Sequence, residues 1–219
     1  EIWTAAFTYV IGDGGAQLTY QSPFLGYRYE KHIALHGNML TLTYRIANKS
    51  EYTFPCIWAC HCLVNLKPGL RLLFPRGTKH VMTVMDTPLL GAANTVYRFP
   101  TDLVAGASTY DFSRAPAPDG TTMLKYYCTE AVREGCCGYR YEAEGVEVKF
   151  CYDPKRLPYL GYWATAGGYR GDCNCALEPT NGFYDSISAA RRNHKCLELE
   201  PSAKLEFALN ITIKQTPHT

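Results

Sequence analysis

The sequence lacks any long apolar run: no stretch of its 219 residues approaches the roughly 18 apolar residues that a membrane-spanning helix needs. It also lacks a cluster of like charges, because 22 basic and 20 acidic residues are scattered along the chain and leave a formal net charge of +2. Proteins that bind nucleic acids or anionic membranes usually carry a basic patch. These absences predict a soluble protein whose partner is neither a nucleic acid nor a membrane.

Internal repeats, low-complexity tracts and linker-like changes of composition are missing as well. A chain of this length can form one all-β domain with a large core. We therefore expect residues 1–219 to form a single domain.

The ten cysteines include no Cys-x-x-Cys pair, which is the usual knuckle of a structural zinc site. Cys136 and Cys137 are adjacent, and Cys173 and Cys175 are separated by one residue, so neither pair is well spaced for a mutual disulfide. We expect free thiols, no bound metal and therefore a reducing, cytoplasmic location.

Alternation of apolar and polar residues is the main structural signal. It has the period of two that is typical of strands with one buried face, and it recurs near the front, the middle and the end of the chain, at residues 40–47, 146–152 and 205–213. The pattern predicts an all-β fold of large antiparallel sheets.

Turn-forming residues separate these segments, at 12–15, 67–69, 115–120 and 166–172. Only one helix is expected, at residues 186–194, with Asp185 or Ser186 as its N-cap. Helix is therefore a minor part of the predicted fold.

The segment "CIWACHCLVN" places a histidine among cysteines. On an extended strand, Ile57, Ala59 and His61 point to one face and the cysteines to the other, which separates His61 from the thiols. Buried cysteines that act as small hydrophobic residues are favoured over a metal site, and no signature marks one of them as a nucleophile. His61 itself is either a structural histidine or a proton donor.

A carboxylate in "CNCALEPTNG" is the second candidate for chemistry. Glu178 directly precedes Pro179, where we expect the strand to end and the side chain to face a concave surface. A solvated glutamate at a strand end is the alternative interpretation.

Together these segments resemble the aldose 1-epimerase (galactose mutarotase-like) superfamily, in particular its bacterial branch. "FPCIWACHCLVNL" is similar to the strand that carries the acid histidine of the family, with His61 and Asn65 in the matching places. "LPYLGYWATAGGYRGDCNCALEPTNGFYDSI" resembles the segment leading to the base, with Glu178 in the matching place, and "LELEPSAKLEFALNITI" resembles the last strand. The opening "EIW" is similar to the continuation of a family segment, so we expect the N-terminal portion of the family domain to be missing.

This resemblance implies a large antiparallel β-sandwich and an enzyme, an isomerase that interconverts the α and β anomers of a hexose. Glu178 would be the base and His61 the acid, on opposite sides of the sugar. Among the substrate-binding candidates, Asn65 would orient His61 or donate a hydrogen bond to a sugar hydroxyl. Trp163 would stack on the sugar, with core packing as the alternative. Lys125 would bind a hydroxyl or an anionic group, with a solvated strand lysine as the alternative. Because the reaction only moves protons, no cofactor is expected.

Two alternatives stay open at this point. A hexose-6-phosphate 1-epimerase would be expected to cluster arginines at its site, whereas Arg71, Arg76 and Arg170 are scattered along the sequence. A non-catalytic carbohydrate-binding protein could share the fold without the reaction. An enzyme is distinguished from it by His61 and Glu178 facing each other across one cleft, about a sugar ring apart.

Overall fold

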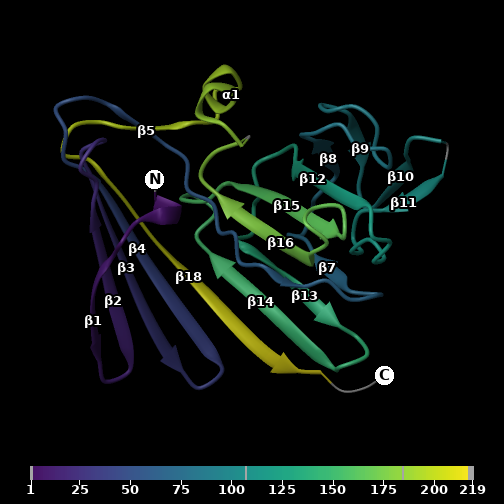
Figure 1. The fold of residues 1–219 in the computed structure, drawn as a ribbon, viewed down its shortest axis with the longest axis horizontal. Coiled ribbons are helices and arrows are strands. Elements are labelled where there is room, and N and C mark those ends of the chain that lie inside the picture. Colours follow the sequence, from purple (N-terminus) through teal and green to yellow (C-terminus); the bar gives the residue numbers. More distant parts are fainter. Residues whose placement is uncertain (1, 107, 184, 217–219) are drawn as a thin grey trace.

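The computed structural model describes residues 2–106, 108–183 and 185–216 of the chain. Antiparallel strands dominate and form two large sheets (Figure 1). The described residues contain one short α-helix, α1 (Ile187–Arg192), and a single 3-10 turn, η1 (Ile2–Thr4). The all-β fold with little helix that the sequence predicts is confirmed.

In the described part of the chain the larger sheet has eight strands, all paired antiparallel. In order across the sheet they are β1 (Thr8–Gly12), β2 (Gly15–Gln21), β3 (Tyr27–His36), β4 (Met39–Asn48), β18 (Lys204–Gln215), β14 (Val146–Tyr152), β13 (Cys136–Tyr141) and β7 (Arg71–Leu73).

The second sheet has six described strands, in the order β6 (Val64–Asn65), β16 (Cys173–Thr180), β15 (Tyr159–Ala166), β12 (Thr122–Cys128), β8 (His80–Thr83) and β9 (Val96–Arg98). The remaining described strands form two separate two-stranded sheets. One pairs β5 (Phe54–Cys56) with β17 (Leu197–Leu199), and the other pairs β10 (Thr101–Leu103) with β11 (Thr109–Asp111).

The three alternating segments of the sequence are neighbours in space. They form β4, β18 and β14 at the centre of the eight-stranded sheet (Figure 1). Leu42, Leu209 and Tyr152 lie in register across these strands, and all three are buried. Their shared apolar face is thus the reason that segments far apart in the chain pair with one another.

The core lies between the two sheets. Tyr126 and Tyr162 of the six-stranded sheet and Phe150 of the eight-stranded sheet are all completely buried. The hydroxyl of Tyr139, on β13, accepts a hydrogen bond from the Leu177 N–H, on β16, which fixes the sheets relative to each other. The opposite face of the six-stranded sheet points away from this core and carries the candidate site.

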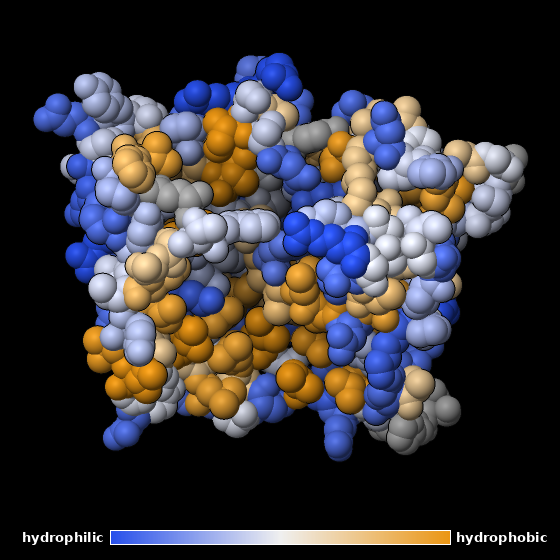
Figure 2. Space-filling model, viewed as in Figure 1, coloured by the Kyte–Doolittle hydropathy of each residue, from blue (hydrophilic) through white to orange (hydrophobic). Residues whose placement is uncertain are grey.

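The apolar face of the eight-stranded sheet continues beyond the core. Tyr9, Ile11, Leu35 and Ile213 lie on the same face as the buried Leu42 but are largely exposed. Figure 2 shows hydrophobic residues gathered over the lower half of this view, where β3, β4 and β18 lie.

Helix α1 begins and ends inside the predicted range. The Ser186 hydroxyl accepts a hydrogen bond from the Ala189 N–H (3.2 Å), so Ser186 rather than Asp185 is the N-cap. The helix ends at Arg192, two residues before the predicted His194. Asp185 is left available for the site described next.

Candidate active site

Strand alternation on β16 turns Glu178 away from the core. Cys175 and Leu177 are completely buried against the other sheet, so Ala176 and Glu178 point to the opposite face. The Glu178 side chain is nevertheless only 3% exposed. A carboxylate with so little access to water needs charged or hydrogen-bonding partners.

The sequence predicts that the strand ends at Glu178, but β16 continues through Pro179 to Thr180. The Pro179 carbonyl accepts a hydrogen bond from the Cys60 N–H (3.0 Å). The N–H and C=O of one strand residue point to the same side, so the backbone nitrogen of Pro179, which has no hydrogen to donate, also faces Cys60 rather than β15. The ladder with β15 therefore loses no donor, and the strand tolerates the proline.

Each carboxylate oxygen of Glu178 meets a different basic side chain. His61 Nδ1 lies 2.8 Å from Oε1, and Lys125 Nζ lies 3.0 Å from Oε2. Among the described residues, no donor is aligned for a hydrogen bond to Oε1. The close contact between Oε1 and His61 is therefore not a hydrogen bond, and it is an ion pair when the imidazole is protonated. One buried oxygen of Glu178 thus keeps unused capacity to accept a proton or a hydrogen bond.

Lys125 joins Glu178 to a second carboxylate. Its Nζ lies 2.9 Å from Asp185 Oδ1, and the Tyr127 hydroxyl donates a hydrogen bond to the same oxygen (2.7 Å). Burial alone would lower the pKa of Lys125, but Glu178 and Asp185 outweigh burial and raise that pKa above its ordinary 10.5. Lys125 is therefore a cation at neutral pH.

The register of the six-stranded sheet assembles this cluster. Tyr127, Gly161 and Glu178 share one row across β12, β15 and β16, while Lys125 and Trp163 share the next row. A Cβ atom at Gly161 would stand 2.9 Å from the Tyr127 ring and 3.2 Å from Glu178 Oε2. The side chains of Tyr127 and Glu178 occupy the space above Gly161 that a larger residue would fill.

His61 comes from the segment between β5 and β6. Ile57, Ala59 and His61 line one cavity, whereas Cys60 is buried in the core, so the predicted alternation of faces is confirmed although the segment is mostly irregular. The indole of Trp3 stacks on the imidazole, with 6.0 Å between ring centroids and 27° between planes.

The cysteines beside His61 have no features of a nucleophile or a metal site. Burial raises the pKa of Cys56 and of Cys60 to about 12, so both are neutral thiols near pH 7. Within the described ranges, no group of three or more His, Cys, Asp or Glu side chains is arranged to hold a metal ion.

The ion-pair cluster opens into a cavity of about 500 Å³. Ile57, Ala59 and Ile187 form apolar wall, and the ionisable side chains of the cluster form the rest together with Trp3 and Tyr127. This volume lies within the ~300–1,000 Å³ that small-molecule sites commonly have.

Three of the five predicted site residues, His61, Lys125 and Glu178, meet in this cavity. Trp163 lies on the same face of the sheet, next to Lys125, but outside the cavity lining. Its indole packs edge-on against Tyr169, with ring centroids 6.0 Å apart.

Asn65 lies farther away. It pairs with Asn174, four residues before Glu178 on β16, which at ~3.4 Å per residue is about 14 Å along the strand. Its carbonyl accepts a hydrogen bond from the Tyr141 hydroxyl (2.8 Å), and it does not line the cavity. Asn65 is therefore not arranged to orient His61.

The spacing of about a sugar ring that would distinguish an enzyme from a binding protein is not found, because His61 and Glu178 are in contact at 2.8 Å. The physical reason is the burial of the Glu178 charge, which favours a close basic neighbour.

Sequence reasoning missed Trp3, Tyr127 and Asp185. Tyr127 is two residues from Lys125 on one strand, so alternation could have found it. Asp185 lies in the loop before α1, where no periodic pattern marks it, and Trp3 reaches His61 only through the tertiary fold.

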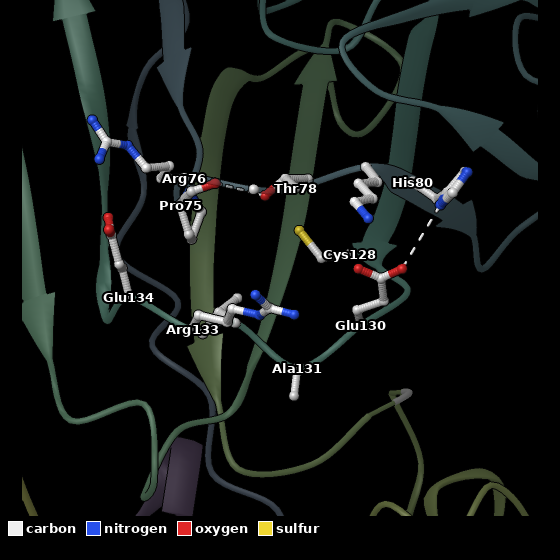
Figure 3. A pocket seen from close by; sticks show the side chains of 12 residues that line it. Pro75, Arg76, Thr78, His80, Cys128, Glu130, Ala131, Arg133 and Glu134 are labelled. Atoms are coloured by element: carbon white, nitrogen blue, oxygen red, sulfur yellow. Dashed lines mark hydrogen bonds and ion pairs between the residues drawn. The ribbon is translucent and has the colours of Figure 1, made fainter.

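A separate cavity of about 350 Å³ lies beside β8 and the loop after β12 (Figure 3). His80 and Glu130 face each other across it at 3.9 Å. Cys128 also lines it, but burial raises the pKa of this thiol to about 12. None of the predicted site residues lines this cavity, and we assign the chemistry to the cavity around Glu178.

No protein-family model matches the chain, and no curated protein matches it in sequence. Solved structures do match its fold. A candidate aldose 1-epimerase from Escherichia coli K12 has a TM-score of 0.71 and 16% identity, over 97% of this chain and 70% of its own. Another candidate aldose 1-epimerase, from Klebsiella pneumoniae, has a TM-score of 0.66 and 14% identity, over 93% of this chain and 50% of its own. Galactose 1-epimerase from Lactobacillus acidophilus NCFM has a TM-score of 0.61 and 11% identity, over 97% of this chain and 67% of its own.

At these identities the likeness is one of fold. The chain spans between 50% and 70% of the length of these three proteins. The chain shares the fold of these aldose 1-epimerases, as the sequence resemblance predicts.

No helix in the described residues is both long and apolar enough to cross a membrane.

Proposed function

We propose that this protein is an aldose 1-epimerase that interconverts the α and β anomers of a hexose, with Glu178 as base and His61 as acid. The observation that carries the proposal is the buried Glu178 carboxylate, whose oxygens meet His61 and Lys125 in one open cavity. The fold shared with a galactose 1-epimerase supports it.

The reaction needs proton transfers at two oxygen atoms of the sugar. The base takes the proton of the anomeric hydroxyl while the acid protonates the ring oxygen, and the ring opens to an aldehyde. Rotation of the aldehyde and the reverse transfers then give the other anomer. Because both oxygens are bonded to the anomeric carbon, an acid and a base in contact with each other can reach both.

Glu178 Oε1 and His61 suit these two transfers. Oε1 is the carboxylate oxygen without an aligned donor in the described structure, so it can accept the hydroxyl proton. His61 adjoins it and its side chain is 31% exposed, so the imidazole can also meet the substrate. General acid and base catalysis contribute about 10²–10⁴-fold each.

We assign Lys125 a positioning role. It holds Glu178 Oε2 and is itself held by Asp185, which Tyr127 anchors. This arrangement holds the Glu178 carboxylate in place at the wall of the cavity. Trp163, in the next row of the sheet, would offer an aromatic face to a substrate that extends beyond the cavity.

An uncharged hexose suits the cavity better than a sugar phosphate. Phosphate sites favour arginine with its paired donors, but no arginine is among the described residues that line this cavity. Lys125 is already paired with two carboxylates. Arg71 pairs with Glu142 instead, and Arg76 lines the separate cavity of Figure 3.

Magnetisation exchange between the anomeric protons tests the proposal. It would be measured by NMR at sugar equilibrium for glucose, galactose and glucose 6-phosphate, with the intact protein, Glu178→Gln and, as a control, the exposed Glu206→Gln. The proposal expects faster exchange for at least one of the free sugars, which is lost in Glu178→Gln and kept in Glu206→Gln. Sugar binding without faster exchange would instead identify a binding protein, and acceleration of the phosphate alone would identify a hexose-6-phosphate epimerase.

A further inference from the structure

Two thiols face each other on the outer side of the eight-stranded sheet. Cys136 on β13 and Cys151 on β14 are direct partners in the antiparallel register, and their sulfur atoms are 3.1 Å apart. Their neighbours in sequence, Cys137 and Phe150, point into the core, so the two thiols point away from it.

The hydrogen-bond pattern puts this pair at a favourable position for a covalent link. The Tyr152 N–H donates to the Gly135 carbonyl (2.8 Å), which makes the adjacent Cys136–Cys151 pair a non-hydrogen-bonded one. At such positions the Cα atoms are about 4.5 Å apart, within the ~4.4–6.8 Å that disulfides span. The backbone therefore need not move for the sulfurs to bond.

Both thiols are within reach of small reagents. Neither is fully buried, and Cys136 lines a cavity of about 270 Å³. The charged side chains of this cavity are three cations and two carboxylates, Arg76, Arg140, Lys149, Glu134 and Glu147. Burial and the Cys136 sulfur raise the pKa of Cys151 to about 11, an effect that Lys149 and Lys214 partly oppose. We therefore expect oxidation to be slow at pH 7 and faster at higher pH, because the thiolate is the reacting form.

We propose that Cys136 and Cys151 form a reversible dithiol–disulfide site that is oxidised by low-molecular-weight disulfides. The Cys136 thiolate attacks one sulfur of the reagent, a mixed disulfide forms, and one reagent thiolate leaves. The Cys151 thiolate then attacks the Cys136 sulfur and expels the second. In sum, two protein thiols and one reagent disulfide give one protein disulfide and two reagent thiols.

Four other cysteines lack this combination of a close sulfur atom and access to reagents. Cys56, Cys60 and Cys175 are buried in the core. Cys173 is exposed, but no thiol contact to it is found in the described residues.

The test uses the whole protein treated with oxidised glutathione at pH 8, followed by alkylation, tryptic digestion without reduction, and mass spectrometry. We expect two of the ten thiols to be lost, and peptides 134–140 and 150–155 to be joined with a loss of two hydrogens. Dithiothreitol should restore both thiols.

Because peptide 134–140 also contains Cys137, variants decide which cysteine reacts. Cys136→Ser and Cys151→Ser should each abolish the joined peptide, whereas Cys137→Ala should keep it. Retention of all ten thiols, a glutathione adduct on Cys136 that never closes, or a joined peptide in Cys136→Ser would each overturn the proposal. Since the Cys136 side chain points away from the core, Cys136→Ser remains informative if Cys151→Ser does not fold.

Discussion

Gly161 lies directly opposite Glu178 across the β15–β16 ladder, and a methyl group at Gly161 would stand 3.2 Å from Glu178 Oε2. The position of the proposed base thus depends on the absence of a side chain on the neighbouring strand.

Gly161→Ala is expected to impair catalysis without unfolding the protein. The added methyl also meets the Tyr127 ring at 2.9 Å, and that ring is buried against Phe183, so much of the displacement falls on Glu178. Because small displacements of catalytic groups are costly, we expect kcat to fall by about 10–100-fold. Gly12→Ala is the matched control, since a Cβ atom there meets nothing within 4 Å. Equal activity of the two variants would contradict this reasoning.

Lys125→Met is expected to lower stability as well as activity. It leaves the buried carboxylate of Glu178 without its lysine partner, which should cost on the order of 3 kcal/mol of unfolding free energy in urea titrations. The double variant Lys125→Met/Glu178→Gln should be more stable than Lys125→Met alone, because the buried charge is gone. Lys204→Met, which breaks an exposed pair, should change stability by no more than about 0.5 kcal/mol.

The raised pKa of Lys125 predicts a contribution to stability that is lost in alkali. A group whose pKa is higher in the folded state stabilises the fold fully below its unfolded pKa, here 10.5. That contribution disappears as pH rises through the folded pKa. Unfolding free energies of the intact protein and of Lys125→Met, measured from pH 8 to 11.5, should differ by a constant amount up to about pH 10 and converge above it. A difference that grows with pH would contradict the assignment.

Trp163 and Asn65 are expected to behave differently when each is replaced by alanine. Trp163 lies in the row next to Glu178, so its loss should raise KM for a substrate that reaches it while kcat changes little. Asn65 lies outside the cavity, so its loss should change neither constant by more than about twofold. Steady-state kinetics on the sugar that reacts fastest distinguish the two, and a large kcat loss in Asn65→Ala would restore its sequence-based role.

The strands were predictable from sequence where one face is buried. The alternation around Leu42 and Leu209 predicts strands, and turn residues such as those at 12–15 separate them. Alternation does not say which strands pair. The adjacency of β4, β18 and β14 arises from long-range packing, which one sequence does not display.

The site was predictable only in part. His61 and Glu178 follow from the family resemblance, Lys125 was a candidate beside a solvated-lysine alternative, and the structure brings the three into one cavity. Asp185 has no local pattern, because loop residues are placed by the fold around them, and Trp3 meets His61 from 58 positions away. The single domain and the missing N-terminal portion stay predictions.

Polarimetry of freshly dissolved α-D-galactose and α-D-glucose tests the central claim most directly. The account predicts that the intact protein speeds the approach to the equilibrium rotation of at least one sugar, and that Glu178→Gln and His61→Gln each lose about 10²-fold or more of that acceleration. Equal acceleration by the intact protein and both variants would contradict the assignment of the acid and base, and no acceleration of either sugar by the intact protein would contradict epimerisation of these hexoses.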